Sequence, residues 1–345
     1  MQPTGPPFEA KAYVCPTKLS RPFRDMGGIT RLGSIPLAAG EVVRADIDAL
    51  FDRTASLAGQ PRTVRELPGG LTNRNYQVTT PQGSFVARIA GTGSDLLAID
   101  RDIEYRNSVT AAAAGAAPPV IEYRPQDSVL VIAYVEGQTL TSADVAEPSN
   151  IPRVAQACRR LHDGNRFGND FDMFAIQQRY REAVRTRGFR IPPGYDDLLP
   201  YLDQAGRALA ASSRDGTVPC NNDLLPANFI DDGERIWLID YELSGNNDAC
   251  FELGNIWAEA HLESGALAEL VAAYYGRPRP SKIARARLLG LAGMYGWTLW
   301  GAIQHAVSTI DFDFWSWGME RFEGAASGLT SSDFGSLLEE TQRDD

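Results

Sequence analysis

The stretch that decides the fold is PCNNDLLPANFIDDGERIWLIDYELSGNNDACFELGNIWAE, residues 219–259. It contains two short apolar runs, one directly after Asn228 and one that ends at Asp240, separated by the acidic turn DDGE. Two apolar runs around a turn that contains glycine predict a β-hairpin. Because hairpin strands are antiparallel, the residue entering the first strand and the residue leaving the second lie at the same open end. The pattern therefore places Asn228 beside Asp240, with Asp223 on a loop just outside them.

The side chains in this group all offer oxygen atoms, which are hard ligands: Asp223, Asn228 and Asp240. Such oxygens bind Mg²⁺, and phosphoryl transfer needs one group to position the attacking hydroxyl and others to hold the metal. The alternative is an ordinary acidic turn with surface carboxylates, since an Asp-x4-Asn spacing is common by chance. The order of the three residues around a hairpin favours Mg²⁺-assisted phosphoryl transfer. In this hypothesis Asp223 is catalytic, and Asn228 and Asp240 are metal ligands.

Composition excludes several other classes of protein. The chain has 345 residues, of which 43% are hydrophobic, enough for a sizeable core and two lobes or domains. A net charge of −11 argues against a nucleic-acid partner. No run approaches the roughly 20 apolar residues of a membrane helix, and the first residues lack the pattern of a signal peptide. Four cysteines without paired metal spacing are typical of buried thiols in a reducing compartment, so we expect a cytoplasmic enzyme with no membrane partner.

The predicted secondary structure changes along the chain, from an irregular N-terminal segment to a region of strands and then to a helical region. Residues 1–40 are rich in Pro and Gly without periodicity, which predicts a poorly ordered extension. From Glu41 an amphipathic pattern predicts a helix with an apolar face formed by Val43, Ile47, Leu50 and Phe51. Strand patterns then cover residues 64–67, 71–80 and 84–91, a helix pattern covers residues 96–114, and two further strand patterns lead to a hinge at residues 133–137. Beyond Gly137 the pattern is helical, including residues 150–162 and 171–211, and the final acidic tail is expected to be solvated.

A loop between the first two of these strands is a candidate for binding phosphate. Gly69 and Gly70 allow the backbone to approach a phosphate closely, and polar side chains follow at Thr72, Asn73 and Asn75. A Gly-Gly pair between strands is as often only a turn. The loop alone therefore leaves both interpretations open.

Taken together, these motifs resemble the choline/ethanolamine kinase family, a branch of the aminoglycoside phosphotransferase and protein-kinase-like superfamily. The resemblance is carried by GG-x-T-N at residues 69–73, NDLLPANF at 222–229, IDYE at 239–242, FELGN at 251–255, and Trp297, Trp300 and Gln304 in the pattern W-x-x-W…Q. It covers about residues 46–325.

The resemblance implies a fold and a set of cofactors. The fold is an α+β, two-lobed protein-kinase-like fold, with a small antiparallel β-sheet in an N-lobe at residues 41–136 and a larger, mainly helical C-lobe at residues 137–345. ATP and Mg²⁺ are the implied cofactors. The ATP phosphates would meet Gly69, Gly70, Thr72, Asn73 and Asn75, together with Arg88, which stands where protein kinases have a lysine and would pair with Glu104. Arg88 is thus assigned both a catalytic and a cofactor-binding role.

For the acceptor, the resemblance implies a small-molecule alcohol bound by Glu242, Glu259, Trp297 and Trp300. Choline is the first choice, because a permanent cation suits indole faces and a carboxylate. Two tryptophans at this spacing also occur as plain core residues. Ethanolamine, thiamine and aminoglycoside antibiotics remain as alternative acceptors, and the oligomeric state is open between monomer and homodimer.

Two residues depart from the family pattern. Asn221 stands where relatives usually have His, and Glu252 where they usually have Asp. An asparagine keeps some hydrogen bonds but not the packing of an imidazole. The departures keep a further alternative open, a catalytically silent pseudokinase that binds nucleotide. A histidine at the end of the helix at residues 150–162, His162, is assigned no chemistry.

Overall fold

The computed structural model describes residues 39–91, 94–212 and 215–345, so the extension expected at residues 1–40 lies almost wholly outside the described residues, as does Cys15. The chain divides into two units between residues 46 and 47. Helix α1 (Ala39–Asp52) crosses the boundary between them. The candidate site lies entirely in the second unit, to which the following description applies.

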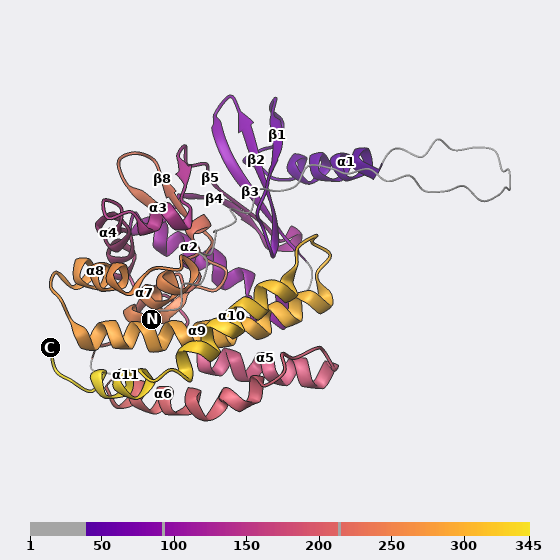
Figure 1. The fold of residues 1–345 in the computed structure, drawn as a ribbon. Helices are drawn as coiled ribbons and strands as arrows, with labels where there is room; N and C mark the ends of the chain where they lie inside the picture. Colours follow the sequence, from indigo (N-terminus) through magenta and orange to yellow (C-terminus); the bar gives the residue numbers. More distant parts are fainter. Residues whose placement is uncertain (1–38, 92–93, 213–214) are drawn as a thin grey trace, which may run out of the picture. The chain divides into compact units, whose positions relative to one another are not determined.

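The smaller lobe is built on one antiparallel sheet (Figure 1). Its order is β1 (Thr63–Leu67), β2 (Asn73–Thr80), β3 (Gly83–Ala90), β5 (Val129–Ala133) and β4 (Val120–Arg124). Alternating residues of β2 point into a small core, where Tyr76 and Val78 pack with Phe51 of α1. The strands expected from the sequence are confirmed. The register sets Arg88 of β3 opposite Asn75 of β2.

The main helix of this lobe begins later than the sequence pattern predicted. The pattern placed its start near Leu96, but residues Ser94–Leu97 form a separate 3-10 turn and α2 spans Arg101–Ala113. The reason is Asp100, whose carboxylate accepts the backbone N–H groups of Asp102 and Ile103 and so caps the helix. The helix gives way to Gly115, at φ +71°, as expected. Because of this start, Arg101 and Glu104 both lie in the first turn, next to the sheet.

The larger lobe is mainly helical. Its helices are α3 (Ser142–Ala146), α4 (Ile151–His162), α5 (Met173–Arg187), α6 (Leu199–Ala211), α7 (Ala249–Glu259), α8 (Ser264–Tyr275), α9 (Pro280–Val307), α10 (Phe314–Leu329) and α11 (Phe334–Glu340). Short strands cross its surface near the smaller lobe: β6 (Gln138–Thr139), β8 (Phe229–Asp231) and β9 (Ile236–Leu238) form one sheet, and β7 (Val218–Cys220) and β10 (Gly245–Asn247) form another. The two-lobed α+β fold is thus confirmed.

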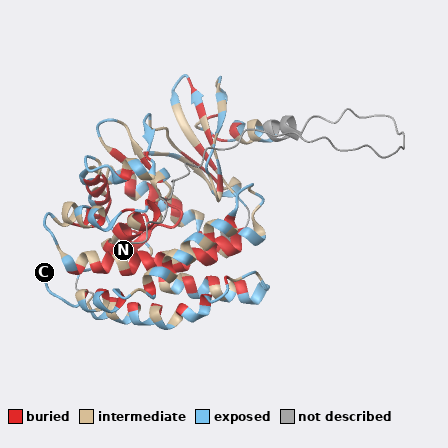
Figure 2. Cartoon of the chain, in the orientation of Figure 1, coloured by how far each residue is buried: buried red, intermediate tan, exposed pale blue. Residues whose placement is uncertain are grey.

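Helix α9 runs through the centre of the larger lobe, with α5, α7 and α10 packed against it. Figure 2 shows buried residues along most of its length, and the buried set includes Trp297, Trp300 and Gln304. Close approach to α7 is possible because Gly254 and Gly290 face one another, and a Cβ on Gly254 would lie 2.1 Å from the Ala286 carbonyl oxygen. The helix that carries the paired tryptophans is therefore packed closely against α7 near Gly290.

The C-terminal segment is not a solvated tail, which corrects the expectation from its acidic composition. Residues Phe334–Glu340 form α11, in which Phe334 and Leu337 are buried. Their i, i+3 spacing puts both side chains on one face of the helix. Tyr201 of α6 meets Phe334 edge-on, with ring centroids 5.7 Å apart. Among the described residues, none of the helices is both long enough and apolar enough to cross a membrane.

Candidate active site

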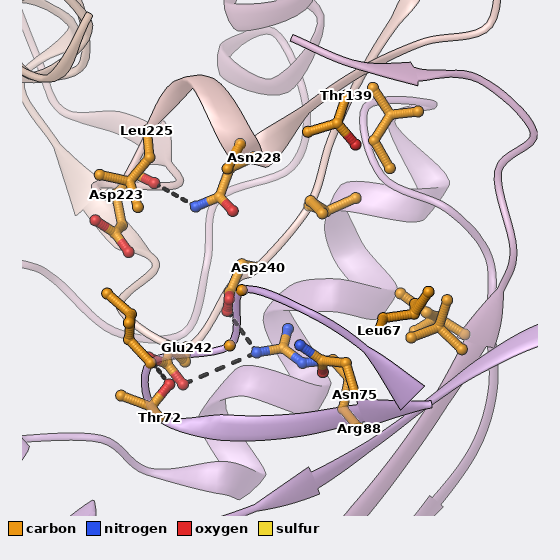
Figure 3. A pocket seen from close by; sticks show the side chains of 18 of the residues that line it. Leu67, Thr72, Asn75, Arg88, Thr139, Asp223, Leu225, Asn228, Asp240 and Glu242 are labelled. Carbon is orange, nitrogen blue, oxygen red and sulfur yellow. Dashed lines mark hydrogen bonds and ion pairs between the residues drawn. The ribbon is translucent and has the colours of Figure 1, made fainter. Parts of the chain in front are cut away.

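The hairpin brings the three expected oxygen ligands together. Strands β8 and β9 pair with Phe229 opposite Leu238, and the Ile239 N–H donates to the Asn228 carbonyl oxygen at 3.0 Å. The Asn228 side-chain amide in turn donates to the Asp223 carbonyl oxygen at 2.7 Å, which leaves its own Oδ1 to act as a ligand (Figure 3). Asp240 follows the second strand with a left-handed backbone, φ 65°, that turns the chain sharply after the strand. The predicted grouping of Asp223, Asn228 and Asp240 is present.

Asn221 makes hydrogen bonds that hold the catalytic loop against the hairpin. Its side-chain amide donates to the carbonyl oxygens of Ile239 and Asp240, at 3.1 and 2.9 Å, and its Oδ1 accepts the Asp223 N–H at 3.1 Å. The residue is fully buried. The asparagine thus connects the backbone of Asp223 to that of Ile239 and Asp240 with three bonds, although it lacks the ring of the usual histidine.

A buried carboxylate holds the backbone of the loop that leads to Asp223. Glu252 of α7 accepts the backbone N–H groups of Asn221 and Asn222, each at 2.8 Å. His162 and Cys220 lie beside it, and the three ligand atoms are all within 4.8 Å of one another, a geometry that could hold a metal ion. Because Glu252 already accepts two backbone donors and His162 Nδ1 lies 2.7 Å from the Tyr274 hydroxyl, we interpret the cluster as structural support. Burial and the neighbouring Glu252 raise the pKa of the Cys220 thiol well above its usual value.

The loop between β1 and β2 is folded tightly enough to require glycine. Gly69 has φ +99°, and a Cβ on Gly70 would lie 2.1 Å from the Asn73 carbonyl oxygen. Behind the loop, the Thr72 hydroxyl and the Asn73 amide donate to the two oxygens of Glu242, at 2.7 and 2.8 Å. Glu242, expected to face the acceptor, lines the cavity, but both oxygens of its carboxylate accept hydrogen bonds from this loop. We therefore group it with the residues that support the loop.

Arg88 lies at the centre of a buried ionic network. Its guanidinium is 2.5 Å from Asp240 Oδ1 and 3.9 Å from Glu242 Oε2 (Figure 3). It is also 3.3 Å from Glu104 Oε1. Burial alone would lower the pKa of Arg88, but these carboxylates outweigh it and the pKa is raised. Arg101 completes the network, with its Nη1 at 2.7 Å from Glu104 and 3.0 Å from Glu242. The pairing of Arg88 with Glu104 expected from the sequence is present, and the network links β3, α2 and the Asp240 segment.

The expected acceptor residues Glu259, Trp297 and Trp300 line the same cavity as Asp223. Glu259 of α7 is buried, and both of its oxygens accept from the Arg321 guanidinium, with Nε 3.2 Å from Oε1. The same guanidinium lies 3.4 Å from the ring centroid of Trp317, whose indole in turn lies 5.0 Å from that of Trp300. Trp297 and Trp300 are nearly fully buried on α9. An ion pair and a group of indole rings therefore share this end of the site.

One cavity of about 360 Å³ joins all of these parts. It is lined by the phosphate loop and β3 (Gly69, Gly70, Leu71, Thr72, Asn75, Arg88), by the hinge (Ala133, Tyr134, Val135, Gly137), by the catalytic set (Asp223, Asn228, Asp240), and by Glu242, Glu259, Trp297, Trp300 and Trp317. Two of the expected residues, Asn73 and Glu104, are absent from this lining and hold other site residues in place. The hinge, Asp223 and the tryptophans therefore line one and the same cavity.

Electrostatics set Asp223 apart from an ordinary surface carboxylate. Burial raises the pKa of Asp223 well above its usual value, and the nearby carboxylates of Asp240, Glu259 and Glu242 raise it further. Arg321 acts in the opposite direction. A strongly perturbed carboxyl group inside a cleft is a typical property of a catalytic base.

Sequence reasoning missed three residues of the site, Arg101, Trp317 and Arg321. Arg101 gave a usable signal, because it follows the capping Asp100 and stands three residues before Glu104 on a helix. Trp317 and Arg321 stand i, i+4 on α10, a spacing that allows the guanidinium to reach the ring. Their proximity to Glu259 depends on how α10 packs against α9, which local pattern does not reveal.

Comparisons with known proteins agree with this geometry. The profile of the phosphotransferase enzyme family, APH, matches residues 63–289. Protein LicA from Haemophilus influenzae is 29% identical over 211 residues, which make up 60% of this chain and 61% of that protein. Ethanolamine kinase 2 from Mus musculus is 28% identical over 299 residues, 76% of this chain and 75% of that protein. This chain therefore spans less than two thirds of the LicA protein.

A solved structure is similar over nearly its whole length. The choline/ethanolamine kinase family protein from Mesorhizobium loti is 30% identical, with a TM-score of 0.76 over 87% of this chain and 99% of that one. The match includes both lobes, and the family profile includes the phosphate loop, the catalytic loop and the hairpin. The chain belongs to the phosphotransferase enzyme family and, within it, to the choline/ethanolamine kinase family.

Proposed function

We propose that this protein transfers the γ-phosphate of ATP to the hydroxyl group of a small amino alcohol, with choline as the first candidate. The observation that carries the proposal is one cavity that is lined by the glycine loop, by Asp223, Asn228 and Asp240, and by a group of tryptophans. In this proposal residues 41–136 supply the phosphate contacts, and residues 137–345 supply the catalytic loop, the metal ligands and the acceptor pocket.

The residues present fit ATP and Mg²⁺. Asn228 Oδ1 and the Asp240 carboxylate are hard oxygen donors of the kind that Mg²⁺ prefers, and the close fold at Gly70 leaves no room for a side chain beside the loop. Mg²⁺ held by these two residues would neutralise negative charge on the phosphates. The Gly69–Asn75 loop and Arg88 would bind and orient those phosphates, and the hinge would meet the adenine.

Asp223 has the chemistry of the base. Its raised pKa makes it a better proton acceptor than a solvent-exposed aspartate, and it lines the same cavity as the proposed metal ligands and the tryptophans, which supports a role next to the acceptor hydroxyl. Asn221 accepts the backbone N–H of Asp223, and Glu252 accepts the backbone N–H groups of the two residues before it. Most of the rate enhancement would come from positioning and charge neutralisation. The intact Asp223, Asn228 and Asp240 set and the bonds of Asn221 support an active enzyme over a silent nucleotide-binding protein.

The acceptor end favours a quaternary ammonium over a primary one. Both oxygens of Glu259 already accept from Arg321, so an ammonium that must donate its own N–H groups would compete with that pair. Choline has no N–H to donate and gains its binding energy from indole faces and a nearby negative charge. Trp297, Trp300 and Trp317 supply those faces. An aminoglycoside, which carries several ammonium groups, would require several carboxylates at this end, whereas Glu259 is already paired with Arg321.

The experiment that tests the proposal measures ADP release with Mg·ATP and four acceptors: choline, ethanolamine, thiamine and kanamycin. The Asp240→Ala variant serves as the blank. We expect choline-dependent turnover that is lost in the blank. Turnover with ethanolamine or kanamycin alone would keep the mechanism and replace the acceptor, and no turnover with any of the four would contradict the proposal.

A further inference from the structure

Gln304 makes a buried contact that the proposed mechanism does not use. It lies near the end of α9, one helical turn beyond Trp300, and is 4% exposed. Its side-chain amide donates to the backbone carbonyl oxygen of Leu71 at 2.9 Å. Leu71 is a residue of the phosphate loop, 233 positions earlier in the chain, and lines the same cavity as Trp300. The helix of the acceptor pocket therefore contacts the phosphate loop directly.

The contact falls next to loop residues that the larger lobe also holds through Glu242. Leu71 is followed by Thr72 and Asn73, whose side chains are held by Glu242. Gln304 holds the carbonyl group of Leu71, the residue that follows Gly70. A glycine backbone can adopt many conformations unless contacts restrain it. Two residues of the larger lobe thus fix three consecutive loop residues, one from the Asp240 segment and one from α9.

We propose that Gln304 is a positioning residue that couples the acceptor pocket to the phosphate loop. An acceptor packed against Trp300 restrains the last turns of α9, Gln304 then holds the Leu71 carbonyl more firmly, and the loop binds the nucleotide phosphates more tightly. By linkage, a bound nucleotide strengthens acceptor binding by the same factor. The inference rests on the proposed function for the identity of the ligands and on the structure for the contact itself.

The test uses Gln304→Met, which keeps the length of the side chain and removes the N–H donor. Gln177→Met is the matched control, because Gln177 is also buried and its amide donates a single bond, to the Tyr195 hydroxyl at 3.1 Å, in a region outside the cavity lining. A third variant, Gln304→Glu, keeps the shape and sets an acceptor oxygen against the Leu71 carbonyl. Thermal unfolding of all the variants checks that each one is folded.

The first measurement is the affinity for a non-hydrolysable ATP analogue with Mg²⁺, without any acceptor. We expect Gln304→Met to bind it about fivefold more weakly, the size expected for one neutral hydrogen bond, and Gln304→Glu at least as weakly. Amide hydrogen exchange at residues 68–76 should become faster in both, whereas Gln177→Met should match the wild type. Unchanged affinity and unchanged loop exchange in the Gln304 variants would overturn the proposal.

The second measurement repeats the nucleotide titration with saturating choline. The wild type should bind the analogue several-fold more tightly than without choline, and this ratio should fall towards one in Gln304→Met. A ratio that is equal in the two proteins would refute the coupling. Failure of the proposed function is recognised separately, because a wild type that releases no ADP with any acceptor can still be judged on nucleotide affinity and loop exchange.

Discussion

At the phosphate end of the cavity five charged side chains contact one another, whereas the acceptor end combines aromatic rings with one ion pair. Arg88 and Arg101 are bound among Glu104, Asp240 and Glu242, so every member depends on the others. At the acceptor end, the indoles of Trp300 and Trp317 pack against one another, and Arg321 is the partner of Glu259. A charged network fixes atoms in one arrangement, while aromatic faces bind over a broad surface. Substitutions at the phosphate end should therefore abolish turnover. Substitutions at the acceptor end should reduce it by degrees.

The largest effect is expected where the two ends meet, at Asp223. Asp223→Asn removes the proton acceptor and keeps the shape, so kcat should fall by about 10³-fold, within the range for general-base groups. Nucleotide affinity should change little, because the Asn221 and Asn228 contacts are to the backbone of Asp223. ADP release and nucleotide titration are the measurements. Asp203→Asn, at an exposed position of α6, is the control, and a large loss of nucleotide affinity in Asp223→Asn would instead indicate a structural role.

The next effect concerns the metal ligands. Asn228→Ala removes one proposed Mg²⁺ ligand and the bond to the Asp223 carbonyl, so kcat should fall about 100-fold or more and the Mg²⁺ concentration needed for half-maximal rate should rise. The rate is measured as a function of Mg²⁺ at fixed ATP. Removal of divalent ions with EDTA should abolish wild-type turnover, and added Mg²⁺ should restore it. An unchanged Mg²⁺ dependence in the variant would exclude Asn228 as a ligand.

A graded effect is expected at the tryptophans. Trp300→Leu keeps an apolar side chain but removes an indole face, worth about 2 kcal/mol for a desolvated cation, so the KM for choline should rise about 30-fold. The KM for ATP should change far less. Steady-state kinetics with each substrate varied in turn measures both. Trp237→Leu, on the hairpin strand β9, is the matched control, and equal rises in both KM values for Trp300→Leu would contradict an aromatic cage.

The smallest effect is a shift in pH dependence that connects the two ends. Because the pKa of Asp223 is raised by burial and by nearby carboxylates, turnover should be lost as the pH falls through that raised pKa, where Asp223 becomes protonated, and retained above it. Glu259→Gln removes one of these carboxylates and should move the acid limb of kcat/KM to lower pH. Arg321→Met removes the opposing positive charge and should move it to higher pH. Shifts in the same direction would show that Asp223 does not control the profile.

Most of the local structure could be predicted from the sequence, because it depends on near neighbours. The hairpin of β8 and β9 follows from two apolar runs around an acidic turn, and its open end brings Asn228 to Asp240. The start of α2 was misplaced because Asp100 was not recognised as its cap. The buried α11 was missed because its two apolar residues are outnumbered by polar ones.

Contacts between distant segments could not be predicted in this way. Arg321 is 62 residues from Glu259, and Gln304 is 233 residues from Leu71. Periodicity places each of these residues on a helix but does not say which helix or loop lies opposite. The resemblance to a family supplied the identity of the acceptor residues, while the partners of Glu259 and Glu242 required the packed structure. For that reason the roles assigned to the individual site residues stay predictions.

The continuity of the cavity has a consequence for inhibitor design. Because the hinge, the glycine loop and the tryptophans line one space, a single molecule could occupy the proposed nucleotide and acceptor positions together. Joining a nucleotide fragment to a quaternary ammonium would make the second contact intramolecular, so affinity would gain from the high effective concentration of the tethered group. The linker would lie in the part of the cavity that Asp223 lines, so its chemistry would have to suit the carboxylate of that residue.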